Sequence, residues 1–75
     1  AAESLFKDEL AKAIARLAAQ PMAGASFRSR VLPGLRRLLL PRSRYHVYYR
    51  IDHERHLVLV HAVWHAARRQ PPAMP

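Results

Sequence analysis

The stretch from residue 45 to residue 52, YHVYYRID, alternates side chains in the period-two pattern of a β-strand. Successive side chains of a strand point to opposite sides of its sheet, so this segment assigns each of its residues to a face. One face receives Tyr45, Val47, Tyr49 and Ile51, and the other receives His46, Tyr48 and Arg50. We therefore expect a strand here, and the rest of the chain has to build a sheet around it.

Apolar runs flank this strand on both sides at hairpin spacing. Residues 35–40 follow a Pro33-Gly34 turn signal and predict a strand, with residues 41–44 as the loop that leads into residue 45. Residues 57–64 are apolar on both faces, which is typical of a central strand covered on both sides, and residues 52–55 form the turn before them. The pattern predicts a three-stranded antiparallel meander.

An amphipathic helix is predicted ahead of the meander. The apolar side chains that recur at helical spacing are Phe6, Leu10, Ala13, Ile14 and Leu17. The helix should end before Pro21, because the residue preceding a proline is pushed out of the α-helical region. Residues 20–34 then form a connector with room for a short edge strand around residues 27–31. Residues 70–75 are rich in proline and predict a flexible tail.

The sum of these elements is a single α+β domain over residues 1–75, with one helix packed on a three-stranded sheet. One helix can cover only one face of the sheet, whereas residues 57–64 require cover on both faces. The sequence therefore predicts that an element is missing, supplied either by upstream sequence or by another protein.

The net positive charge is confined to the second part of the chain. The net charge is +8, from 13 Lys and Arg against five Asp and Glu. The charges of residues 1–27 cancel, whereas residues 28–75 hold ten arginines against Asp52 and Glu54. Arginine binds phosphate and carboxylate groups through two parallel hydrogen bonds, so this half predicts a surface for an anionic partner. A solvated basic surface that only aids solubility is the alternative.

Several kinds of site are excluded by composition. The chain has no cysteine, which removes disulfides and thiolate metal sites and favours a reducing, cytoplasmic location. No run approaches the ~20 apolar residues of a membrane span. His61 and His65 would point to one face of a strand but lie about 13 Å apart, too far to share a metal ion. Neither a metal, a cofactor nor a serine hydrolase triad is expected.

A set of cationic and hydrogen-bonding side chains remains as the candidate site. It consists of Arg36, Arg37, Arg50, Arg68 and Arg69 together with His46, Tyr48 and His65. Cleavage of RNA through its 2′-hydroxyl needs a base, an acid and cations that stabilise the phosphorane. His65 or His46 could transfer protons and Tyr48 could donate one, while arginine supplies only charge. Three of these residues also have a purely structural interpretation. Tyr48 would be a half-buried sheet residue, Arg50 a cross-strand ion partner and His65 the end of a strand.

The chain resembles the RelE/ParE superfamily, the toxins of type II toxin–antitoxin systems. The resemblance rests on LPGLRRLLL (32–40), YHVYYRID (45–52) and VHAVWHAARRQPP (60–72), in that order. The preceding helix matches the second helix of that fold. Members of the superfamily usually begin with a strand and a first helix, so the resemblance implies that this domain is N-terminally incomplete.

The resemblance implies two different activities. RelE-like members cut mRNA on the ribosome, whereas ParE-like members bind and inhibit DNA gyrase. Lysine occurs only at Lys7 and Lys12, on the predicted helix, so the sheet lacks the lysines of the active ribonucleases, which favours a ParE-like toxin that is not an enzyme. The residues carried over to target or antitoxin binding are Arg36, Arg37, Arg50, His65, Arg68 and Arg69.

Two alternatives stay open at the level of the sequence. If the protein is a ribonuclease, the catalytic set is His65, Arg50, Tyr48 and Arg68, and the partners are the ribosome and mRNA. A generic basic nucleic-acid-binding module is the other, and it predicts steeply salt-dependent binding to bare DNA or RNA. Under either toxin reading, a cognate antitoxin is expected to wrap the toxin and to become ordered as it binds.

Overall fold

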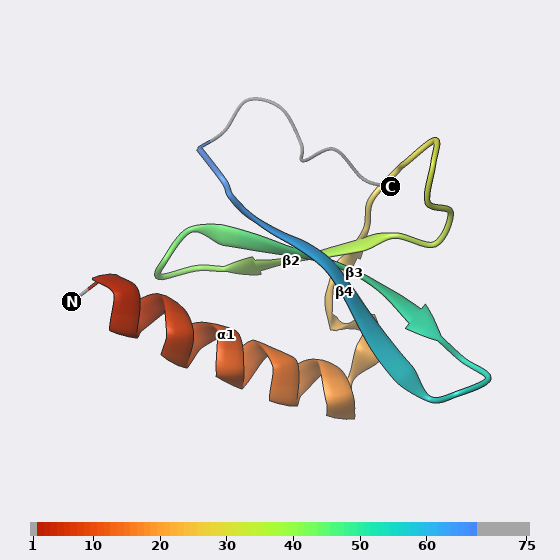
Figure 1. Cartoon of the computed structure of the whole chain (residues 1–75), viewed down its shortest axis with the longest axis horizontal. Helices are drawn as coiled ribbons and strands as arrows, with labels where there is room; N and C mark the ends of the chain where they lie inside the picture. The colour runs from red at the N-terminus through yellow and green to blue at the C-terminus, as the bar shows by residue number, and fades with distance from the viewer. Residues whose placement is uncertain (1, 68–75) are drawn as a thin grey trace.

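The computed structural model describes residues 2–67 and places one α-helix against an antiparallel sheet (Figure 1). The elements in order are α1 (Ala2–Ala19), the short 3-10 helix η1 (Pro21–Ala23), β1 (Ala25–Ser26), β2 (Arg36–Leu40), β3 (Tyr45–Asp52) and β4 (Leu57–His65). The sheet is four-stranded, in the order β1-β2-β3-β4. The predicted α+β class is confirmed. The short edge strand lies at residues 25–26 and not at residues 27–31, so the sheet has one strand more than the predicted meander.

Helix α1 follows the predicted pattern. It ends at Ala19, and Gln20 leaves the α-helical region (φ −135°, ψ 77°) before Pro21 begins η1. Ala13 and Leu17 are buried, as predicted for the apolar face. Ile14 is 49% exposed although the pattern places it on that face, because the sheet does not extend under this flank of the helix.

The core lies between α1 and one face of the sheet, which we call the helix face. Its buried members Ala13, Leu40 and Val47 are surrounded by Phe6, Leu10, Leu38, Tyr45 and Val63. Val47 and Tyr49 are fully buried, in keeping with the predicted alternation along β3. Burial of a side chain such as Val47 contributes roughly 1.5–3 kcal/mol, so this small core depends on few residues.

Tyr49 ties η1 to the sheet. Its hydroxyl donates a hydrogen bond to the Pro21 carbonyl oxygen at 2.7 Å and accepts one from the Gly24 N–H at 2.9 Å. A Cβ atom on Gly24 would lie 2.6 Å from the Tyr49 hydroxyl and 2.8 Å from the Arg37 carbonyl oxygen. Glycine is therefore required where the chain passes from η1 into β1.

Glu9 fixes the turn between β2 and β3. Its carboxylate accepts hydrogen bonds from the backbone N–H groups of Arg42 (2.7 Å) and Ser43 (2.8 Å). Partial desolvation works to raise the pKa of Glu9, but the hydrogen bonds from Ser43 and Arg42 and the Arg42 charge outweigh it and lower that pKa. One carboxylate on α1 thus holds the loop at the far end of the sheet.

Strand β4 lies at the edge of the sheet, which corrects the prediction that residues 57–64 form a central strand. Leu57 and Val60 are 47% and 46% exposed, so neither face of this strand is fully covered. A doubly covered strand and an uncovered apolar edge strand have the same sequence pattern, so the apolar run alone does not distinguish them.

A β-bulge interrupts the pairing of β3 with β4. Tyr48 pairs with Ala62 and Tyr49 pairs with Val60, which leaves His61 as the extra residue. A bulge changes which face the following side chains occupy. His61 contacts Arg50, whereas His65 contacts Tyr45 on the helix face, so the prediction that both histidines point to one face is wrong.

Two further observations concern only the part of the chain that the structure describes. No helix within residues 2–67 has the length and apolar composition that a bilayer span requires. Within the same residues, no group of three His, Asp or Glu side chains comes close enough together to hold a metal ion.

Candidate functional site

The face of the sheet turned away from α1, which we call the outer face, carries Arg37, His46, Tyr48 and Arg50. Arg37 and Tyr48 are cross-strand partners on β2 and β3. Phe27 folds over them from the connector: its ring meets the Tyr48 ring edge-on at 5.2 Å, and the Arg37 guanidinium carbon lies 5.0 Å from the Phe27 ring centroid. The aromatic ring attracts the cation and limits the positions that the guanidinium can occupy. The guanidinium of Arg37 is therefore a half-exposed positive charge whose position is restricted by the Phe27 ring.

Arg50 and His61 form a second contact on the same face. The Arg50 Nε–H donates a hydrogen bond to His61 Nε2 at 3.1 Å, so this histidine nitrogen carries no proton in the arrangement. His61 is the extra residue of the β-bulge, so the contact lies where β3 and β4 change register. Among residues 2–67, neither Arg37 nor Arg50 has a carboxylate partner. Their charges remain available to an anion.

His46 lies between these cations and the end of the sheet. Its ring centroid is 6.2 Å from that of Tyr48. Burial, followed by the charges of Arg37 and Arg44, lowers the pKa of His46 below its ordinary value. His46 is consequently neutral at neutral pH, where it can accept a proton or a hydrogen bond.

Arg36, a predicted binding residue, points to the other side of the sheet from Arg37. Its guanidinium donates to the Met22 carbonyl oxygen (3.2 Å), to the Gly24 carbonyl oxygen and to Ser26 Oγ (3.4 Å). These acceptors belong to η1 and β1. In the structure Arg36 holds the connector against the sheet, and its donors are directed inwards.

His65, which was also predicted as a binding residue, lies on the helix face as well. Its ring meets the Tyr45 ring edge-on at 5.0 Å, and its Nδ1 accepts a hydrogen bond from the Ala67 N–H at 3.1 Å. Tyr45 in turn packs against Phe6 of α1, with ring centroids 4.6 Å apart. His65 is thus part of an aromatic stack at the end of β4.

The predicted site is therefore divided. Arg37, Tyr48 and Arg50 share the outer face, whereas Arg36 and His65 lie on the helix face. Arg68 and Arg69, and the predicted tail at residues 70–75, lie outside the described residues. The sequence analysis predicts no functional role for Phe27, and it weighs His61 only as a metal ligand. No sequence signal reveals that Phe27 folds onto Tyr48 or that β4 bulges at His61.

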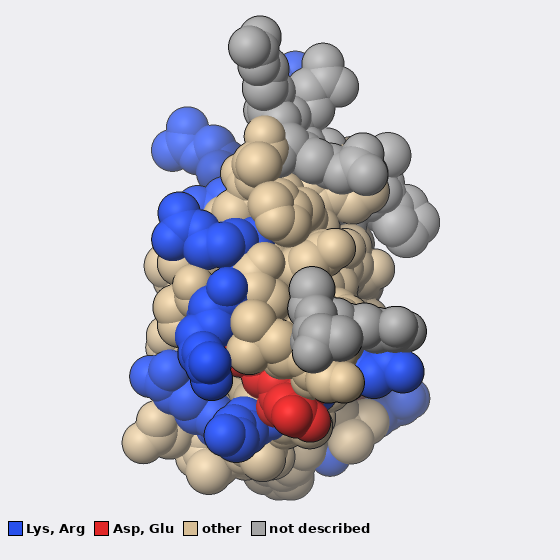
Figure 2. All heavy atoms as spheres, turned by 90° about the vertical axis from the view of Figure 1, so that its left-hand side faces the viewer, with Lys and Arg blue, Asp and Glu red and all other residues tan. Residues whose placement is uncertain are grey.

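Exposed positive charge is prominent at one end of the molecule. Arg42 and Arg44 lie in the exposed β2–β3 turn, close to the start of the helix. Figure 2 shows Lys and Arg side chains gathered along one side of this end, next to a smaller acidic patch. The surface as a whole is suited to a partner of negative charge.

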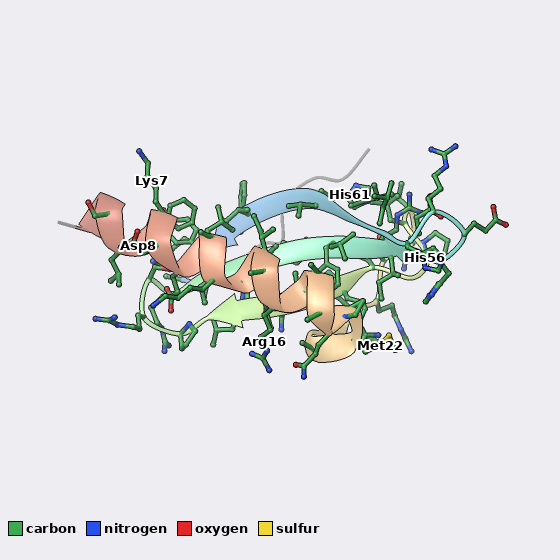
Figure 3. All side chains as sticks on the ribbon, turned by 90° about the horizontal axis from the view of Figure 1, so that it is seen from below. Lys7, Asp8, Arg16, Met22, His56 and His61 are labelled. Atoms are coloured by element: carbon green, nitrogen blue, oxygen red, sulfur yellow. The ribbon has the colours of Figure 1, made fainter. Side chains whose placement is uncertain are left out.

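An apolar groove lies between α1 and the β3–β4 hairpin. The helix crosses the sheet at an angle and leaves the hairpin uncovered towards His56 (Figure 3). The groove has a volume of about 480 Å³, and its principal apolar lining is Ile14, Leu17, Met22, Ile51, Val58 and Val60. Such an exposed apolar surface on a small domain is typical of a protein-binding site. The groove lies on the helix face, so it differs from the open face opposite the helix that the sequence predicted, and its position follows from the direction of α1.

Comparison with known proteins gives one match. The sequence model of a family described as "ParE toxin of type II toxin-antitoxin system, parDE" matches residues 1–70. No curated protein and no solved structure matches the chain.

Proposed function

The chain belongs to the ParE toxin family of type II toxin–antitoxin systems, and from this premise we propose that it arrests growth by binding DNA gyrase. Membership implies a toxin with a cognate antitoxin. In the proposal, the outer face with Arg37 and Arg50 contacts an anionic surface of the gyrase–DNA complex, and the antitoxin blocks the toxin until it is removed. The toxin acts in the cytoplasm by binding and uses no cofactor.

The division of the predicted site supports binding over RNA cleavage. A ribonuclease of this kind needs its base, its acid and its cations around one phosphate. His65 lies on the helix face, whereas Tyr48 and Arg50 belong to the outer face, so these three residues cannot surround one phosphate. The Tyr48 side chain is 2% exposed beneath Phe27, and both lysines lie on α1. This is the observation that carries the proposal.

One arrangement favours a second candidate function, cleavage of mRNA on the ribosome. His46 is held neutral partly by the charge of Arg37, and both lie on the face that carries Arg50. A neutral histidine beside two cations could accept the 2′-hydroxyl proton while arginines stabilise the phosphorane. The acid for the leaving oxygen would have to come from the covered Tyr48 or from His61, whose Nε2 already accepts the Arg50 N–H.

The proposed function is tested with purified protein on two substrates. Gyrase and relaxed plasmid form one reaction, and translating ribosomes with a defined message form the other. The proposal expects loss of supercoiling and an intact message. Message cut between codons, with normal supercoiling, would assign the second candidate. Tight binding to bare DNA that disappears in moderate salt, without either effect, would indicate the generic nucleic-acid-binding module.

A further inference from the structure

Arg50 and His61 form a contact between two side chains that can both carry positive charge. The Arg50 Nε–H donates to His61 Nε2 at 3.1 Å, and both side chains are half-buried. Within residues 2–67, this is the only polar contact that either side chain makes. A guanidinium has five N–H donors in one plane, so the two Nη groups of Arg50 keep theirs for a ligand.

His61 changes its hydrogen-bonding role when it takes up a proton. Neutral imidazole accepts through one ring nitrogen, whereas protonated imidazole donates through both. Protonated His61 therefore cannot accept the Arg50 N–H, and the two like charges repel each other. An anion between the two side chains removes this repulsion, because its oxygens accept from both. The pair thus favours neutral His61 without a ligand and protonated His61 with one.

Few other charges act on this pair. Strand β4 is an edge strand, so β3 is the only strand beside His61 in the described sheet. By alternation along β3, the outer-face neighbours of Arg50 are Tyr48 and Asp52. Asp52 accepts an N–H bond from Arg55 (3.1 Å) and lies 3.8 Å from its guanidinium, which offsets its charge. The other titratable group of this face is His46, which lies beyond Tyr48.

We propose that Arg50 and His61 together bind a backbone phosphate of DNA, and that His61 takes up a proton as the phosphate enters. One phosphate oxygen accepts from an Arg50 Nη–H and another accepts from His61 Nε2–H, in place of the direct contact between the side chains. The proton comes from solvent and is held on Nε2. The inference rests on the proposed function, because it identifies the anion that the outer face contacts in the gyrase–DNA complex.

The position of Arg37 favours DNA phosphates over the carboxylates of an acidic protein surface. Arg37 pairs with Tyr48 across the sheet, so it is the diagonal neighbour of Arg50, about 7–8 Å away. Successive phosphates of one DNA strand repeat at a comparable spacing, whereas carboxylates on a protein surface have no fixed repeat. Two cations at this spacing therefore match two neighbouring phosphates of one strand.

The test measures binding of a short oligothymidylate to the purified full chain at about pH 7.5 and about pH 5.5, at constant ionic strength. Neither phosphodiesters nor thymine titrate in this range, so any pH dependence comes from the protein. We expect wild type to bind on the order of tenfold more tightly at the lower pH, the change in protonated fraction of a typical histidine over this range. Calorimetry in two buffers of different ionisation enthalpy should show proton uptake on binding.

Three variants locate the proton. His61→Gln keeps an acceptor for Arg50 but takes up no proton, so its affinity should change by less than about twofold between the two pH values. His61→Lys carries a permanent charge and should bind tightly at both. His46→Gln is the matched control, which should keep the pH dependence of wild type. Circular dichroism at both pH values checks that each variant is folded.

The possible outcomes separate this inference from the proposed function. Equal wild-type affinity at both pH values, or a pH dependence lost in His46→Gln and kept in His61→Gln, would overturn the role of His61. No binding of oligothymidylate by a chain that inhibits gyrase would overturn the phosphate site and leave the proposed function standing. Polyglutamate bound as tightly as oligothymidylate would assign the pair to an acidic protein surface. Proton-linked DNA binding without gyrase inhibition would overturn the proposed function alone.

Discussion

Replacing Tyr49 with phenylalanine tests how the connector is held to the sheet. The hydroxyl is the acceptor for the buried Gly24 N–H and the donor to the Pro21 carbonyl oxygen, and the side chain is fully buried. Phenylalanine fills nearly the same volume, so the change isolates the two hydrogen bonds. An unsatisfied buried donor costs about 1–3 kcal/mol, and the half-exposed Pro21 carbonyl can bind water instead.

We therefore expect Tyr49→Phe to lower the free energy of unfolding by about 2–3 kcal/mol. In a domain of this size, this corresponds to a decrease in Tm of about 10–20 °C. Urea denaturation followed by circular dichroism measures the difference. Tyr45→Phe is the matched control, because the Tyr45 hydroxyl has no hydrogen bond within residues 2–67 and its ring contacts would survive.

The result that would refute this reasoning is a change below about 0.5 kcal/mol for Tyr49→Phe, the range of ordinary surface substitutions. A large and equal loss in Tyr45→Phe would also refute it, since ring packing and not the hydroxyl pair would then be responsible. Faster exchange of the Gly24 amide in Tyr49→Phe would place the damage at the predicted hydrogen bond.

The remaining predictions concern two titratable groups. The folded pKa of Glu9 is lowered, so the ionised carboxylate should stabilise the fold at neutral pH, and this effect should be lost as the pH falls through that pKa. Glu9→Gln should therefore have a lower free energy of unfolding than wild type at pH 7. Urea titrations should show this difference vanishing at about pH 3. The folded pKa of His46 is also lowered, so protonation should destabilise the fold as the pH falls below the unfolded value. Its imidazole should titrate below about 6.5 by NMR, and Arg37→Gln should raise that pKa; a value at or above 6.5 in the wild type would contradict the proposed cause.

The helix and the three longer strands could be predicted because their side chains follow clear periods. Phe6 to Leu17 follow the helical period and end at Pro21, and Tyr45 to Asp52 alternate. The position of β4 at the edge of the sheet could not be predicted, because an apolar run occurs both in central strands and in edge strands. The family resemblance, by contrast, was carried by local segments and is confirmed by the match over residues 1–70.

The candidate site was predicted in composition but not in arrangement. Arg36 and Arg37 are adjacent, and only the register of β2 against β3 decides which one faces outwards. The bulge at His61 places His65 and Arg50 on opposite faces of the sheet, and no local sequence signal reveals this bulge. Phe27 lies at the candidate site because its ring contacts Tyr48, which is distant from it in the sequence. Such features depend on tertiary packing, which a single sequence does not state.

The central claim is that Arg37 and Arg50 act together on the outer face to grip an anionic target. The most direct measurement is the concentration of protein that halves gyrase supercoiling for the double variant Arg37→Glu/Arg50→Glu and for a control of equal charge change, Lys12→Glu/Arg16→Glu, on the exposed side of α1. Because a charge-assisted hydrogen bond contributes about 1.5–3 kcal/mol, the outer-face variant should require at least about tenfold more protein, and the control less than about threefold more. Equal losses in both variants would show that net charge alone matters, and no loss in the outer-face variant would contradict the claim.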